Sequence, residues 1–299
     1  MTEWTMIGVP SSAGAHHAGQ ELAPAALRAA GLLDQLAAAG VQATDRGDLP
    51  GATFEVDCDH PRARNLPAVL RVIREVADAV ADVVAAGKLT LVVGGDCTIT
   101  LGVVAGFRRR YPRVGLAYVD GDADLSSDEA GDSGILDSAG IAHLLGLGSP
   151  ELNGFDGAPP LLDASRIAML GCDPREVTAT RRQFLAEAGI SYAEAAEFSA
   201  DPEGAARRAL VALARSSSPV IVHFDVDVVD SGDLPLGNFP HYGSGVRLEH
   251  AVRGLRVLLA NPACAALVLT EVNPTHDPSG RQLARYLAGL TTAMAARAS

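Results

Sequence analysis

Apolar runs of strand length alternate with helical stretches along almost the whole of this 299-residue chain. The apolar runs lie near residues 4–9, 89–93, 115–119, 166–170, 219–224 and 265–270. The stretches rich in Ala, Leu, Arg and Glu lie near residues 22–39, 67–87, 98–110, 176–188, 202–216, 247–260 and 280–297. This alternation predicts an α/β fold with a mostly parallel sheet and helices on both faces. Since we find no low-complexity linker or internal repeat, we expect a single domain over residues 1–299.

Two of the apolar runs end in aspartates spaced two residues apart. Asp120, Asp122 and Asp124 follow one run, and Asp225 and Asp227 follow another. Side chains alternate faces along a strand, so each cluster projects to one side if strand geometry persists. Like charges so close are costly unless a cation lies among them, and oxygen ligands favour hard divalent cations such as Mn²⁺ or Mg²⁺. The alternative is a pair of solvated acidic loops.

Two more strand-like runs end in residues that could serve a site. One leads into Gly94, Gly95 and then Cys97, and the other delivers Glu271 at its tip. Irregular stretches rich in Gly, Pro, Asp and Ser cover residues 48–64, 125–137 and 230–245. Two of these stretches directly follow the aspartate clusters, at the carboxyl ends of strands. Open α/β sheets bind their ligands at such ends.

The overall composition excludes several classes of function. A net charge of −12 argues against nucleic acid or an anionic membrane as a partner. No apolar run reaches about 18 residues, and no basic and apolar leader opens the chain, so we expect a soluble, cytoplasmic protein. The four cysteines, Cys58, Cys97, Cys172 and Cys264, are widely separated and include no C-x-x-C pair. A disulfide framework or a zinc ribbon is therefore not expected.

With these motifs in view, the chain resembles the arginase/agmatinase (ureohydrolase) family. Members carry, in this order, Gly-Gly-Asp-His, Asp-Ala-His-x-Asp, Phe-Asp-x-Asp-x-x-Asp and Glu-x-Asn-Pro. The matching segments here are Gly94-Gly95-Asp96-Cys97, Asp120-Gly121-Asp122-Ala123-Asp124, Phe224-Asp225-Val226-Asp227-Val228-Val229-Asp230 and Glu271-Val272-Asn273-Pro274. Residues 7–12, 19–32 and 45–49 also look like the family's opening strand, first helix and second strand exit. The resemblance implies a three-layer α/β/α fold, a binuclear Mn²⁺ centre, and hydrolysis of a guanidino group to urea and an amine.

The resemblance also implies a set of metal ligands, with two departures from the family. The set is Cys97, Asp120, Asp122, Asp124, Asp225 and Asp227. Cys97 and Asp122 stand where the family has histidines, so the set would be strongly negative, and a thiolate favours softer metals than Mn²⁺. Either Cys97 is not a ligand, or Asp122 or a bridging group holds a proton, or the second metal binds weakly.

The resemblance further suggests residues for proton transfer and substrate binding. Asp137 occupies the position of the family's shuttle histidine, and His143 lies six residues on, as either a packed helix histidine or a catalytic group. Glu271 would pair with the nitrogens of the guanidinium. Asp137, His143 or His241 could protonate the departing amine. His241 could also line a substrate pocket, and Asp173 lies in a shortened loop where relatives bind the far end of the substrate.

Other residues receive a structural interpretation. We interpret His223 as a packing residue of its strand, His16 and His17 as exposed loop residues, and Asp230 as structural, because its spacing of three from Asp227 breaks strand alternation.

Our leading hypothesis is a metal-dependent hydrolase of a guanidino or amidino compound, assembled as a homo-oligomer by analogy. Its substrate is not expected to be arginine itself, because the loops that would bind the far end depart from the arginase pattern. The alternative is a non-catalytic arginase-fold protein whose degenerate metal site serves binding or assembly. A one-metal or Mg²⁺-type site with other hydrolytic chemistry is a third possibility.

Overall fold

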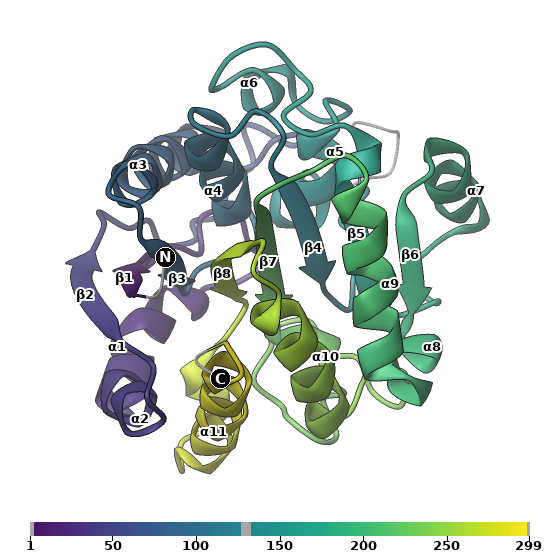
Figure 1. Cartoon of the computed structure of the whole chain (residues 1–299). Helices are drawn as coiled ribbons and strands as arrows, with labels where there is room; N and C mark the ends of the chain where they lie inside the picture. The colour runs from purple at the N-terminus through teal and green to yellow at the C-terminus, as the bar shows by residue number, and fades with distance from the viewer. Residues whose placement is uncertain (1–2, 127–132, 298–299) are drawn as a thin grey trace.

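The computed structural model describes residues 3–126 and 133–297, and an eight-stranded sheet forms its centre (Figure 1). The strands are β1 Trp4–Gly8, β2 Ala43–Asp48, β3 Leu89–Val93, β4 Gly115–Val119, β5 Ile167–Cys172, β6 Ser191–Glu194, β7 Val220–Asp225 and β8 Cys264–Thr270. They lie in the order β2-β1-β3-β8-β7-β4-β5-β6, and every neighbouring pair is parallel. The predicted α/β fold is confirmed.

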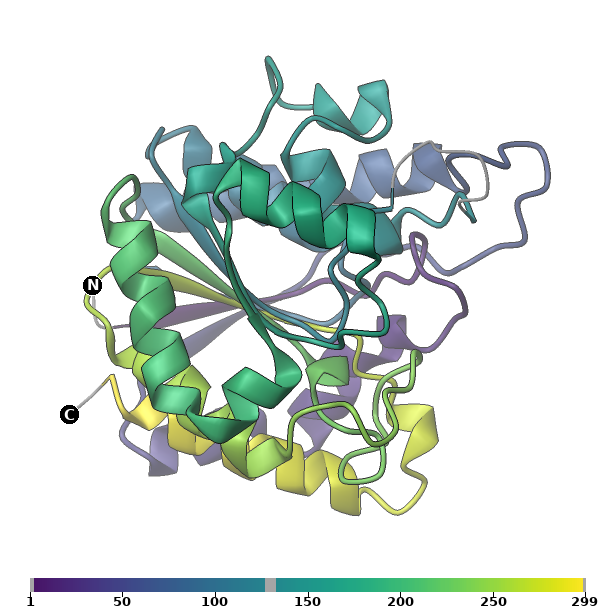
Figure 2. The same ribbon diagram turned by 90° about the vertical axis from the view of Figure 1, so that its right-hand side faces the viewer.

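Helices cover both faces of this sheet (Figure 2). One face carries α1 Ala23–Ala29, α2 Leu32–Ala38, α8 Ala195–Ala200, α9 Pro202–Ala214, α10 Leu248–Ala260 and α11 Arg281–Ala295. The other carries α3 Leu66–Ala85, α4 Ile99–Arg108, α5 Gly140–Leu144, α6 Pro150–Asn153 and α7 Ala179–Ala188. Each helical layer buries its apolar side chains against one set of alternating strand residues, which gives the three-layer α/β/α architecture that the resemblance implied.

Two glycines let helix α4 pack closely on helix α3. A Cβ atom on Gly102 would lie 2.5 Å from the carbonyl oxygen of Ile73, and one on Gly106 would lie 2.7 Å from that of Ala77. Only glycine permits backbones to approach so closely. The contact fixes the start of α4, which directly follows Cys97.

The structure differs from the sequence-based expectations at several elements. The predicted helix over residues 22–39 is wrong in one point, because it divides into α1 and α2 at Gly31, whose φ of 84° ends the first helix. Strands β2 and β6 were not among the predicted apolar runs, and their side chains are mostly half-buried or exposed. Part of the expected irregular stretch 125–137 lies outside the described residues.

Two further predictions concern the chain as a whole. No helix in the described ranges is long and apolar enough to cross a membrane. The single domain over residues 1–299 stays a prediction.

The central strands β3, β8, β7 and β4 bring four loop regions together at one edge of the sheet. The chain runs from β1 to its neighbour β2 on one side and from β4 through β5 to β6 on the other. Between β3 and β4 it skips the places of β8 and β7. Such a change in strand order opens a crevice at the carboxyl ends of the strands, where ligands bind.

Candidate metal centre

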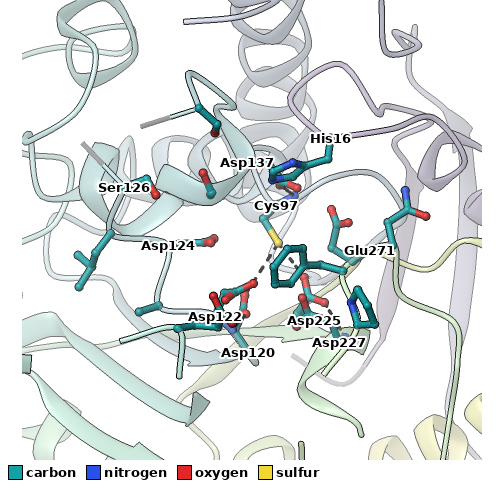
Figure 3. Close-up of a pocket in the computed structure, with 18 of the residues that line it drawn as sticks. His16, Cys97, Asp120, Asp122, Asp124, Ser126, Asp137, Asp225, Asp227 and Glu271 are labelled. Carbon is teal, nitrogen blue, oxygen red and sulfur yellow. Dashed lines mark hydrogen bonds between the residues drawn. The ribbon is translucent and has the colours of Figure 1, made fainter. Parts of the chain in front are cut away.

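A cavity of about 470 Å³ opens at the carboxyl ends of these central strands (Figure 3). Its lining includes all six residues of the ligand set that the sequence suggested: Cys97, Asp120, Asp122, Asp124, Asp225 and Asp227. These residues come from three separate parts of the chain and meet because β3, β7 and β4 end at the same edge. The structure therefore places the predicted residues around one cavity.

Four buried side chains form what we call the inner group: Cys97, Asp120, His223 and Asp225. One donor atom from each lies within 4.8 Å of the others. Cys97 Sγ lies 2.8 Å from Asp225 Oδ2, and His223 Nε2 lies 3.4 Å from Asp120 Oδ2. A thiol, an imidazole and two carboxyl groups thus face one another in a space that excludes solvent.

Strand alternation and a glycine turn assemble the inner group. His223 and Asp225 are two residues apart on β7 and share a face, while Asp120 follows the neighbouring strand β4. Gly94 and Gly95 have φ angles of 90° and 95° and turn the chain so that Cys97 reaches the same space. A Cβ atom on Gly95 would lie 2.9 Å from the carbonyl oxygen of Val9, so the turn requires glycine.

His223 was interpreted as a packing residue, and that interpretation is incomplete. The ring does stack on Tyr118, with 4.0 Å between ring centroids. Its Nδ1 lies 2.8 Å from the hydroxyl of Thr100, however, and its Nε2 faces the inner group. The rule that paired Asp225 with Asp227 could have found it, since His223 stands two residues before Asp225.

Three further side chains form what we call the outer group: Asp122, Asp227 and His241. Nε2 of His241 lies 3.7 Å from Asp122 Oδ2 and 3.8 Å from Asp227 Oδ2. Among the described residues this buried nitrogen has no hydrogen-bond partner. The group is less enclosed than the inner one, because the side chain of Asp122 is 24% exposed.

Asp173 fixes the orientation of the His241 ring. Its Oδ2 lies 3.2 Å from His241 Nδ1 and 2.7 Å from Arg175 Nη2, and it also accepts a hydrogen bond from Ser244. Burial raises the pKa of Asp173, but the hydrogen bonds from Arg175 and Ser244 outweigh burial and lower it below its usual range. Asp173 was predicted to bind substrate; the structure turns it toward His241 and Arg175 instead.

The two aspartate clusters lie near one another, but neither continues the geometry of the strand before it. Strand β4 ends at Val119, Asp124 has a φ of 47°, and Asp227 lies in the short 3₁₀ helix Val226–Val228. The expectation that strand geometry persists through both clusters is therefore wrong, because turns replace it. Asp124 lines the cavity, accepts a hydrogen bond from the Tyr118 hydroxyl, and belongs to neither group.

Burial sets the protonation of the carboxyl groups around the cavity. It raises the pKa of Asp120, Asp124 and Asp225 well above the usual range, and neighbouring carboxylates raise it further. Burial likewise raises the pKa of Asp122 to about 6, although His241 opposes the shift. Burial and then Asp225 raise the pKa of the Cys97 thiol. Without a cation these groups therefore retain protons that ordinary carboxyl groups lose.

The two imidazoles are shifted in opposite directions. Burial lowers the pKa of His223 to about 3. Burial also lowers that of His241, but the nearby carboxylates of Asp122 and Asp227 outweigh it and raise its pKa to about 11.

Glu271 and Asp137 also lie close to Cys97, and one atom from each of the three side chains lies within 4.8 Å of the others. Glu271 follows β8 with a φ of 61°, a strained conformation for a residue with a side chain. Its Oε2 accepts a hydrogen bond of 2.7 Å from Gln20, while its Oε1 has no hydrogen-bond partner among the described residues. Asp137 Oδ1 accepts a hydrogen bond of 2.6 Å from the backbone N–H of Cys97. Both acids line the cavity.

The remaining candidates lie in different places. His143 is buried in α5 against Gly148 and is absent from the described lining of the cavity, so its catalytic role gains no support. His241 is absent from that lining too, so its predicted place in the wall of a substrate pocket gains no support either. His16 and His17 do line the cavity, although we expected them to be only surface residues. Asp230 Oδ1 accepts a hydrogen bond of 2.9 Å from the backbone of Gly232, in keeping with a structural role.

Sequence reasoning did not single out Gln20 or Arg181 as members of the cavity lining. Gln20 stands in the segment 19–32 that resembles the family's first helix, so that resemblance could have drawn attention to it. Arg181 belongs to the first turn of α7, which reads as an ordinary surface helix, and no signal in the sequence marks it.

The donor atoms fit divalent cations. Five carboxyl groups and a thiol of the suggested ligand set line the cavity. Burial is the largest cause that raises the pKa values of Cys97, Asp120, Asp122, Asp124 and Asp225. The unpartnered Nε2 of His241 points at two of the carboxyl groups. Carboxylate oxygens suit Mn²⁺ or Mg²⁺, whereas imidazole and thiolate extend the range to Co²⁺ and Zn²⁺.

Comparison with known proteins agrees with the fold. The sequence profile of the arginase family matches residues 2–296. An arginase of Bacillus caldovelox is 29% identical to this chain over 278 residues, which cover 91% of each chain. A solved structure of arginase from the same organism superposes with a TM-score of 0.86, at 26% identity over 98% of each chain. A formiminoglutamase of Trypanosoma cruzi, solved with Mn²⁺, shares the fold with a TM-score of 0.76 at 18% identity over 100% of this chain and 94% of its own. The chain belongs to the arginase family.

Proposed function

We propose that this protein is a metal-dependent hydrolase that cleaves a C–N bond of a guanidino or amidino compound, releasing urea and an amine from a guanidino substrate and an amide and an amine from an amidino one. The observation that carries the proposal is the cavity itself, in which buried carboxyl groups adjoin an unpartnered oxygen of Glu271. The proposed metal ligands are those that the sequence suggested: Cys97, Asp120, Asp122, Asp124, Asp225 and Asp227. Two divalent cations, with Mn²⁺ as the first candidate, are the proposed cofactors.

Glu271 is the proposed anchor for the substrate. Gln20 holds one carboxylate oxygen, and the other is buried without a partner. A planar guanidinium presents two parallel N–H groups that match a carboxylate in charge and geometry. Because the surrounding cavity is acidic, it favours a cationic group over a neutral or anionic one.

The proposed reaction replaces one C–N bond by a C–O bond. When bound, the cations would lower the pKa of a water molecule enough for it to act as a nucleophile near neutral pH. The water oxygen bonds to the guanidino carbon, the bond to the departing nitrogen breaks, and that nitrogen takes up a proton. Asp137, which lines the cavity, is the proposed donor of this proton, because burial raises its pKa well above the usual range and its Oδ1 accepts a hydrogen bond from the Cys97 N–H. The proton that the water loses on forming the C–O bond restores the acid form of Asp137.

The rival function is a binding or assembly role without catalysis. Its support is that Cys97 and Asp122 replace the histidines of the family pattern, and that the Cys97 thiol lies within hydrogen-bond distance of Asp225. A protein of this kind would retain the fold and the aspartates but bind no catalytic metal.

Metal content and urea release distinguish the two functions. The purified protein is dialysed against a chelator, loaded with Mn²⁺, Co²⁺ or Zn²⁺, analysed for bound metal, and tested for urea release from a panel of guanidino compounds. We expect about two metals per chain and urea from at least one compound. Glu271→Gln, which keeps the shape of the side chain and removes its charge, should retain the metals and lose about 10²-fold in kcat/KM. Absence of retained metal under every loading, together with absence of urea, would leave the binding role as the better account.

A further inference from the structure

His223 has the contacts of a metal ligand as well as those of a packed side chain. Its Nδ1 lies 2.8 Å from the Thr100 hydroxyl, which can accept the Nδ1 proton. Its Nε2 then presents a lone pair toward the inner group, 3.4 Å from Asp120 Oδ2 and 3.3 Å from the Thr270 hydroxyl. Metal-binding histidines almost always use their second nitrogen in such a hydrogen bond.

The spacing within the inner group resembles that around a tetrahedral metal ion. Bonds of about 2.0–2.3 Å to zinc separate the ligand atoms by about 3.3–3.8 Å. Here Nε2 of His223 lies 3.4 Å from Asp120 Oδ2 and 3.7 Å from Cys97 Sγ, and Sγ lies 4.0 Å from Asp120 Oδ2. His223 Nε2 also lies 4.0 Å from Asp225 Oδ2, whereas Cys97 Sγ and Asp225 Oδ2, at 2.8 Å, are clearly closer. A small outward movement of that pair would complete the arrangement.

His241 shows the same pattern in the outer group. The carboxylate of Asp173 accepts the Nδ1 proton at 3.2 Å, and Arg175 in turn holds Asp173. The ring is 1% exposed, and its Nε2 lacks a hydrogen-bond partner while it faces Asp122 and Asp227. Without metal, the charges of Asp122 and Asp227 favour a proton on this nitrogen. A divalent cation held among the three groups would take the place of that proton.

Gly121 makes room for the His241 ring. A Cβ atom at this position would lie 2.7 Å from both Cδ2 and Nε2 of His241, closer than such atoms approach. In the family pattern quoted above, the position of Gly121 is alanine and the next position is histidine. In this chain both are changed, and the imidazole of His241 reaches the same neighbourhood from the loop after β7.

We propose that His223 and His241 are metal ligands, one in each half of the centre. The inner group binds one cation through Cys97, Asp120, His223 and Asp225, and the outer group binds a second through Asp122, Asp227 and His241. Because its donors include sulfur and nitrogen, the inner site selects Zn²⁺ or Co²⁺ over Mn²⁺. The inference rests on the proposed function for the presence of two cations, but it assigns them different ligands.

Cobalt binding tests this assignment without reference to activity. The metal-free protein is titrated with Co²⁺ while bound metal is counted and the visible and near-ultraviolet spectra are recorded. We expect about two Co²⁺ per chain, with a thiolate-to-cobalt charge-transfer band that Cys97→Ser removes. His223→Ala should weaken the inner site by at least about 100-fold, and His241→Ala should do the same to the outer site.

Three further variants separate loss of a ligand from loss of folding. Gly121→Ala removes no donor atom but places a Cβ atom 2.7 Å from the His241 ring and 2.9 Å from the carbonyl oxygen of Asp227, so it should weaken the outer site more than the inner one. Gly154→Ala adds a methyl group where the nearest atom lies 3.4 Å away, and it should change neither site. His143→Ala removes a buried imidazole outside the described lining of the cavity and should also leave both sites intact. Far-ultraviolet circular dichroism checks the folding of each variant.

The outcomes distinguish this inference from the proposed function. If the His223 and His241 variants fold and bind two Co²⁺ as tightly as the parent protein, the inference is overturned, even if the protein releases urea. A parent protein that binds no Co²⁺ also overturns it. If the histidine variants lose metal as expected but no guanidino compound yields urea, the ligand assignment stands and the proposed hydrolase does not.

Discussion

The inner and outer groups contain similar donor atoms but are held in place by different means. The inner group sits at the ends of β4 and β7 and on the glycine turn after β3, so the hydrogen-bond ladder of the sheet fixes it. The outer group sits on turns and on a loop, and the ring of His241 depends on Asp173, Arg175 and Ser244. The same kind of site can thus be fixed by secondary structure on one side and by a chain of side-chain contacts on the other. Changes outside the metal ligands should therefore disturb the outer group more than the inner one.

The largest expected effect comes from removing an inner carboxylate. Asp225→Asn keeps the shape of the side chain but removes a charge from the inner group. We expect loss of the inner metal and a fall in urea release of more than about 10²-fold, measured by elemental analysis and a urea assay. Asp230→Asn, which changes a nearby aspartate outside the described cavity lining, is the control. Equal losses in both variants would mean that the effect is not specific to the inner group.

The next effect concerns the stability of the metal-free protein. Burial raises the pKa of Asp122 to about 6 and that of Asp120 and Asp225 well above the usual range. A carboxyl group with a raised pKa stabilises the folded state below its unfolded pKa of about 4, and this contribution is lost as pH rises through the folded value. The Tm of the metal-free protein should therefore fall by several degrees as pH rises from about 4, with the part due to Asp122 complete near pH 6.

Scanning calorimetry at a series of pH values tests this dependence. Asp122→Asn should flatten the part of the fall between about pH 4 and pH 6, because it removes the outer carboxyl group whose pKa burial raises to about 6. Loading with metal should abolish the fall, since bound cations compensate the charges. A Tm that rises over this range in the metal-free protein would contradict the electrostatic account of both groups.

Asp173→Asn tests the dependence of the outer group on its supporting contacts. It removes the charge that orients His241 and should weaken the outer metal by about 10- to 100-fold while leaving the inner metal unchanged. Isothermal titration with Co²⁺ resolves the two sites. Asp163→Asn, an exposed aspartate paired with Arg166, serves as the control. Equal weakening of both sites would show that the two halves are not independent.

The smallest effect is expected at Thr100, whose contact with His223 in the inner group corresponds to that of Asp173 with His241 in the outer group. Thr100→Val removes the hydroxyl that meets His223 Nδ1 but keeps the side-chain volume. Stacking on Tyr118 and the position of His223 on β7 still hold the ring, so inner affinity should fall by less than about 10-fold. The same Co²⁺ titration measures it. A loss as large as that of Asp173→Asn would remove the distinction between strand-held and loop-held ligands.

The sequence predicted those parts of the fold and the site that depend on local pattern. Strands β3, β4, β5, β7 and β8 are buried on both faces, so each appears in the sequence as a continuous apolar run. The edge strands β2 and β6 have few buried side chains and give no such run. The aspartate clusters were found because carboxylates after buried strands are unusual.

A local sequence pattern could have identified His223, whereas no local pattern identifies His241. Alternation along β7 places His223 beside Asp225, so the sequence contained the signal for it. His241 lies sixteen residues after Asp225, the last residue of β7, in a loop whose path depends on contacts with Asp173 and Ser231. Its closeness to Asp122 and Asp227 follows from the folded loop and has no counterpart in sequence spacing.

Anomalous diffraction from crystals of the protein loaded with Zn²⁺ or Co²⁺ is the most direct test of this two-part centre. The account predicts two anomalous peaks, one bonded to Cys97 Sγ and His223 Nε2 and the other to His241 Nε2. Peaks bonded only to carboxylates, or no peak in the cavity, would contradict it.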